Sequence, residues 1–75
     1  MLHKKYPSAT KYVVDKLQRG QQTDVEGRTY TVFEGVGIVM KKADYYIVVI
    51  AGGVNRFFNT LIELVDHILV TRGYQ

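Results

Sequence analysis

The glycine pair Gly52-Gly53 is the part of this sequence that most resembles a ligand-binding turn. An apolar, strand-like run precedes the pair, and Arg56 follows it at the start of a helix that we expect to begin near Val54. No Ser, Thr or Asp stands at the expected cap, so the first backbone N–H groups of that helix would be open to an anion or phosphate. The Lys-Ser/Thr of a P-loop and the third glycine of a dinucleotide fingerprint are missing. A tight reversal that packs the helix on the strand is therefore the interpretation that we favour.

Basic side chains form a second candidate site, for nucleic acid. The chain has 10 Lys+Arg against 7 Asp+Glu, and this net charge of +3 is compatible with an anionic partner without requiring one. Tyrosines are interleaved with the lysines and could stack on bases. Solvent-facing lysines explain the pattern at least as well. The residues of the anion or nucleic-acid hypothesis are Lys4, Lys5, Lys11, Lys41, Lys42, Gly52, Gly53 and Arg56.

Residue types that serve in catalysis are present, but their spacing does not bring them together. Asp66 and His67 are neighbours on an expected helix and would point about 100° apart, and Ser8 is the expected cap of another helix. Nucleophilic catalysis needs a nucleophile beside its base. The sequence has no cysteine, and His3 lies far from His67, so neither a disulfide nor a metal site is expected. We therefore predict a protein that is not an enzyme and that holds no cofactor or metal.

Hydrophobic periodicity predicts an α+β fold with the element order α-β-β-β-α. The expected elements are a helix over residues 8–19, strands over 28–34, 36–40 and 45–51, and a long helix from about 54 to 73. The strands should form a three-stranded antiparallel meander packed with both helices, and a short fourth strand at 22–25 is an alternative. We expect one domain over residues 1–75, in which 1–6 form a flexible basic arm.

This element order is also that of double-stranded-RNA-binding domains. Those domains carry a lysine cluster at the start of their last helix, where this chain has Val54-Asn55-Arg56-Phe57-Phe58. Because that motif is absent, the likeness is limited to element order and we do not assign the chain to the family.

The strand expected at 45–51 carries the main functional clue, because both of its faces are apolar. A strand buried on one face would alternate apolar with polar residues, whereas here Tyr46, Val48 and Ile50 face one way and equally apolar residues face the other. The first helix has few apolar residues, so we expect both helices to share one face and the second face to meet another subunit. The predicted interface residues are Tyr46, Val48, Ile50 and Val39, with the opposite face as the alternative.

Length and hydropathy indicate in which cellular compartment we expect the chain to act. The longest apolar run is about half the length of a membrane span, and the first residues do not resemble a signal peptide. We therefore predict a cytoplasmic, non-catalytic interaction or regulatory protein that forms a homo-oligomer through an apolar sheet face and has no membrane partner. The alternative is a nucleic-acid-binding accessory protein that uses the basic residues named above.

Overall fold

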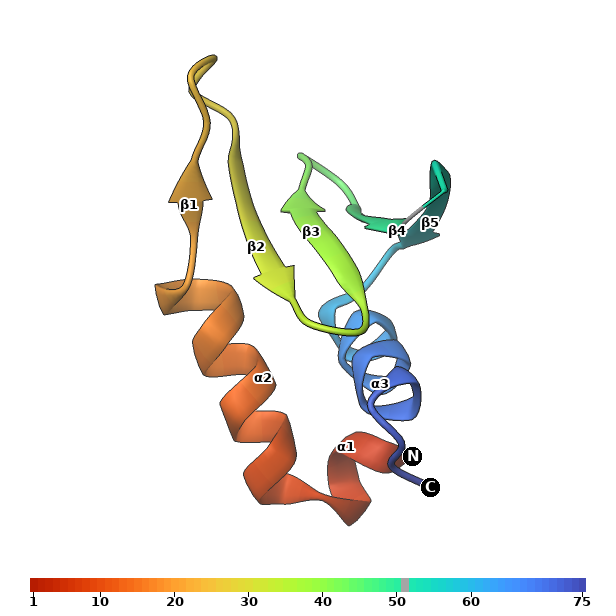
Figure 1. Cartoon of the computed structure of the whole chain (residues 1–75). Coiled ribbons are helices and arrows are strands. Elements are labelled where there is room, and N and C mark those ends of the chain that lie inside the picture. The colour runs from red at the N-terminus through yellow and green to blue at the C-terminus, as the bar shows by residue number, and fades with distance from the viewer. Residues whose placement is uncertain (51) are drawn as a thin grey trace.

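The computed structural model describes residues 1–50 and 52–75 and has the predicted α+β class (Figure 1). Over these residues, three helices accompany a five-stranded antiparallel meander in the order β1-β2-β3-β4-β5. The elements are α1 (Leu2–Lys5), α2 (Pro7–Arg19), β1 (Gln22–Thr23), β2 (Thr29–Phe33), β3 (Gly37–Lys41), β4 (Tyr46–Ile50), β5 (Val54–Phe58) and α3 (Leu61–Thr71). The predicted sheet of three or four strands was therefore too small.

Helices α2 and α3 cover one face of the sheet and enclose the core with it (Figure 1). From the helices, Val13 and Leu64 are fully buried, and from the strands Val48 is fully buried beneath them. The complete set of buried apolar residues is Val13, Phe33, Val36, Val39, Val48, Leu64, Val65, Ile68 and Leu69. The expectation that both helices share one face is thus met, and the helix-side face of the meander is the one that the chain itself covers.

The residues after the glycine pair form strand β5 instead of the start of a helix. β5 pairs with β4 from Ile50↔Val54 to Tyr46↔Phe58, and the Gly53 N–H donates to the Ile50 carbonyl across the turn at 3.2 Å. The predicted helix from Val54, and with it the open helix N-terminus beside the glycines, was wrong. The apolar residues of this segment fit a helical spacing better than they fit period two, so pairing along β4 and not the local pattern determines the strand. Ala51, which the expected strand 45–51 included, lies outside the described residues.

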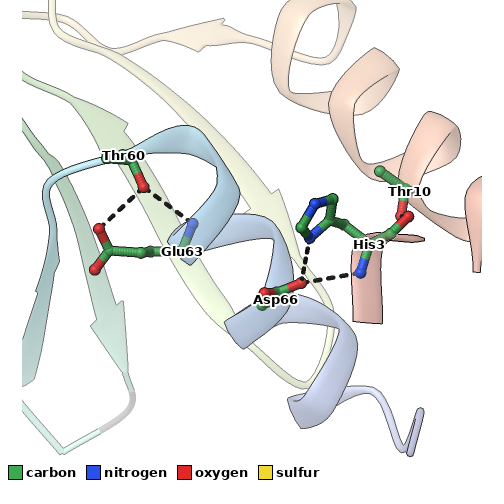
Figure 2. A network of polar contacts seen from close by, with 5 residues as sticks. All are labelled: His3, Thr10, Thr60, Glu63 and Asp66. Carbon is green, nitrogen blue, oxygen red and sulfur yellow. Dashed lines mark hydrogen bonds and ion pairs between the residues drawn. The ribbon is translucent and has the colours of Figure 1, made fainter. Parts of the chain in front are cut away.

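Helix α3 begins only after Thr60, which caps it. The Thr60 Oγ1 accepts a hydrogen bond from the Glu63 N–H at 3.2 Å and donates one to the Glu63 carboxylate at 3.0 Å (Figure 2). Thr-x-x-Glu is the capping-box pattern, in which the side chain of the cap satisfies an N–H group that the helix cannot. The local sequence therefore fixes the start of α3 and separates it from β5.

The first residues of the chain lie against its last helix. Leu2–Lys5, expected as part of a basic arm, forms α1, and Asp66 Oδ1 in α3 accepts from the His3 N–H at 3.0 Å and lies 3.1 Å from its Nδ1 (Figure 2). Thr10 Oγ1 donates to the His3 carbonyl at 3.0 Å. These bonds tie α1, α2 and α3 together.

Candidate interaction surface

The face of the sheet opposite the helices, here called the outer face, is apolar across four strands. The register places Val32, Ile38 and Val49 side by side in one row, and Met40, Ile47 and Phe57 in the next. The outer face comprises Tyr30, Val32, Ile38, Met40, Tyr45, Ile47, Val49, Asn55 and Phe57, with the polar Asn55 opposite Val49 on β5.

No charged side chain of strands β2 to β5 lies on this face among the described residues. Within the described residues of β2 to β5, the charged side chains are Lys41 and Arg56. Lys41 pairs with Tyr46 and Arg56 pairs with Val48, so both belong to the helix-side face of the sheet. Within these strands the outer face is therefore uncharged and largely apolar, and no part of the described chain covers it.

Several large apolar side chains of the outer face are exposed to solvent. Phe57 is 62% exposed, Ile38 40% and Val32 39%, and the rings of Phe57 and Tyr45 pack with their centroids 5.9 Å apart. Single exposed apolar residues are common, but contiguous apolar patches with polar rims mark interaction sites. This surface is the strongest candidate functional site in the molecule.

One end of the outer face is hollowed into a shallow groove. Val32, Ile38 and Val49 line it, together with Glu34 and Gly37, and its volume is about 540 Å³. Gly37 has a φ of +141°, and a Cβ there would overlap the Val49 carbonyl oxygen. The absence of a side chain at Gly37 thus allows the β4 backbone to approach closely.

The predicted interface residues lie on the other face. Val48 and Val39 are 0% and 3% exposed beneath the helices, and Tyr46 and Ile50 pack partly buried against the same core. Val39 and Val48 cannot belong to an exposed interface, which corrects that assignment. The physical reason is that α3 is apolar enough to cover this face with α2. The opposite face, which we kept as the alternative, is the exposed one.

The predicted anion site at Gly52 and Gly53 loses its basis, because these residues form a hairpin turn and not a helix N-terminus. Arg56 lies on the helix side of β5, where it acts on His67 of α3. Burial and the positive charge of Arg56 lower the pKa of His67 below its ordinary value. The His67 ring lies 4.9 Å from the Phe58 ring, and its buried Nε2 has no hydrogen-bond partner among the described residues.

The other residues of the nucleic-acid hypothesis are spread over several elements. Lys4 and Lys5 belong to α1, Lys11 to α2, and Lys41 and Lys42 to the end of β3 and the turn after it. Lys5 Nζ donates to the main-chain oxygen of Gln75 at 2.7 Å, and Lys41 lines a cleft of about 250 Å³ between α2 and the sheet. The structure thus does not place these lysines on one common element.

Some polar pairs of the described chain join different elements, whereas others, such as Arg19–Asp15, are local. Asp66 contacts His3 whereas His67 contacts Phe58, so the adjacent Asp66 and His67 point to different partners. The His3–Asp66 pair joins residues 63 positions apart, and no local sequence signal could have found it. Within residues 1–50 and 52–75, no three His, Asp or Glu side chains gather closely enough to hold a metal ion.

Two further findings concern the chain as a whole. Among the described residues, no helix is both long enough and apolar enough to cross a membrane. Comparisons with protein-family models, with curated proteins and with solved structures found no match to this chain. Function must therefore be inferred from the geometry of the chain itself.

Proposed function

We propose that this protein is a non-catalytic interaction module that associates through the outer face of its sheet, and that its partner includes other copies of the same chain. The single observation that supports this is the uncharged and largely apolar outer face of β2 to β5, on which Asn55 is the one amide side chain. A sheet in contact with water normally carries polar side chains on its second face. Here Ile38 and Phe57 stand where polar residues would be expected.

The energetics favour covering this face. Removing apolar surface from water contributes about 25 cal/mol per Å², and the core of a homodimer interface is more apolar than ordinary protein surface. A chain of 75 residues also buries a smaller share of its surface than a larger domain does. Association would add buried apolar area and would link the stability of the fold to protein concentration.

Sedimentation equilibrium at low and high protein concentration tests the proposal. We expect the average mass of the wild type to rise with concentration, and Ile38→Lys to remain a monomer because it places a charge among the apolar side chains of the outer face on the central strand β3. Val70→Lys is the matched control, since Val70 is 59% exposed on α3, away from this face. Circular dichroism verifies that each variant is folded. A wild type that stays monomeric at high concentration, or an Ile38→Lys variant that associates as the wild type does, contradicts the proposal.

Nucleic-acid binding is separated from this proposal by a second measurement. Titration with duplex and single-stranded oligonucleotides at low and moderate salt reports it directly, because such binding weakens as salt increases. Binding at low salt that is lost in Lys11→Glu and retained in Ile38→Lys would favour the nucleic-acid alternative over self-association.

A further inference from the structure

The cleft between α2 and the sheet lies on the helix side, away from the outer face. Its sheet lining comes from the beginning of β2, the end of β3 and the beginning of β4. Val14 and Leu17, both half-buried, line it from α2, and Leu61 lines it from the first turn of α3. The volume of about 250 Å³ lies just below the roughly 300–1,000 Å³ of small-molecule sites. A ligand of this cleft must therefore be small.

Polar side chains from three adjacent strands form one wall of the cleft. The register places Lys41 beside Tyr46, and extending the β2–β3 register by two residues places Thr29 beside Lys41. All three line the cleft, as does Thr31, which is 2% exposed. Ammonium and hydroxyl groups donate hydrogen bonds. This wall thus offers one positive charge and several donors beside apolar side chains.

The positive charge of this cleft is not balanced by the chain itself. Lys41 is the charged residue of the lining, which contains no Asp or Glu of the described chain. None of the ion pairs within residues 1–50 and 52–75 involves Lys41. A single ammonium group beside hydroxyl donors matches a singly charged carboxylate, and the apolar side chains of Val14, Leu17 and Val39 match a hydrocarbon body.

We propose that this cleft binds a small monocarboxylic acid with a hydrocarbon body. The carboxylate pairs with Lys41 at the polar wall, and the hydrocarbon lies between Leu17 of α2 and Val39 of β3. Removal of these apolar side chains from water favours binding. The site is separate from the outer face, so this inference goes beyond self-association and does not rest on it.

Titration with sodium octanoate, followed in ¹H–¹⁵N NMR spectra, tests the proposal. We expect saturable shifts of the Thr31 and Val39 amide signals and no comparable shift at Phe57 on the outer face. Octanamide has the same number of carbons without the charge and should bind about threefold to tenfold more weakly, as should octanoate to Lys41→Gln. Lys42→Gln is the matched control, because it makes the same change of charge at a residue outside the cleft lining, and it should bind as the wild type does.

The outcomes of this titration are distinct from those of the sedimentation experiment. Saturable shifts in the cleft that weaken in Lys41→Gln alone support the proposal. Absence of saturable shifts, or shifts concentrated at Phe57, overturns it. Octanamide that binds as tightly as octanoate, or equal weakening in Lys41→Gln and Lys42→Gln, also overturns it, because binding would then not depend on the charge of Lys41. The titration is repeated in the Ile38→Lys variant, and loss of the shifts there would attribute them to self-association and overturn the proposal.

Discussion

Gly37→Ala is the most direct test of how β3 and β4 are joined beneath the outer face. Gly37 has a φ of +141°, where an L-residue is strained by about 1–3 kcal/mol. An added Cβ would also overlap the Val49 carbonyl oxygen, so β4 must move. We therefore expect a loss of about 3 kcal/mol or more in the free energy of unfolding, which is large beside the roughly 4–11 kcal/mol expected for a chain of this length.

Gly35→Ala is the matched control for this substitution. Gly35 also has a positive φ, +78°, but a Cβ there would meet no atom within 4 Å. Its replacement should cost only the backbone strain, about 1–2 kcal/mol.

Urea denaturation followed by circular dichroism compares the two variants. With a slope of about 1 kcal/mol per molar, Gly35→Ala should lower the midpoint by about 1–2 M, and Gly37→Ala by about 3 M or to the point where no cooperative transition remains. Equal midpoints for the two variants would show that the close approach of β4 to Gly37 does not constrain the fold.

Three further predictions use the same denaturation assay. Thr60→Ala should destabilise the protein by about 1 kcal/mol through loss of the α3 cap, whereas Thr60→Ser should retain most of the stability, and equal loss in both would exclude capping as the cause. Leu64→Ala, at a fully buried site, should cost about 2–5 kcal/mol, clearly more than Leu61→Ala at a site that is 36% exposed. The lowered pKa of His67, caused by burial and by Arg56, means that the unfolded chain binds this proton more readily than the folded one does. Its contribution to stability should be complete above about pH 6.5 and should decline as the pH falls toward the folded-state pKa. Midpoints at pH 7.5 and 5 should therefore differ less in His67→Gln than in the wild type, and an unchanged difference would exclude this residue as the cause.

Local patterns were sufficient for α2 and for strands β2 to β4. Pro7 stands in the first turn of α2, as expected for a residue with fixed φ and no N–H. The alternation of Thr29–Phe33 and the short, β-branched apolar run of Tyr46–Ile50 each predicted a strand. These elements need no long-range contact to be recognised.

Strand β5 was missed because its apolar residues follow a helical spacing, whereas each of its two strand faces mixes apolar with polar residues. Val54, Phe57 and Phe58 fit one side of a helix, but within a strand Val54 and Phe58 share the helix-side face. The capping-box pair Thr60 and Glu63 was a readable signal that a helix begins later. The capping box, and not the apolar spacing, marks where α3 begins.

The sequence predicted that one apolar face of the sheet would be uncovered, but it did not predict which of the two faces. A strand with two apolar faces implies that one face needs a cover from elsewhere. Which face the chain covers is decided by how α3 docks, and both faces of Tyr46–Ile50 offer it similar side chains. The covered side, with Val48 at its centre, is therefore fixed by tertiary contacts such as those of Leu64 and Ile68, which no local pattern reveals.

The His3–Asp66 bond has a consequence for the order in which the molecule assembles. Closing a loop of 63 residues costs about 2–3 kcal/mol more chain entropy than closing the turn between Ile50 and Val54. The hairpins of the meander can therefore form early, and the docking of α1 and α2 onto α3 comes late. Until that docking, the sheet presents two apolar faces to water instead of one. The interval before helix docking is thus the stage at which newly made chains are most exposed to misassembly with one another.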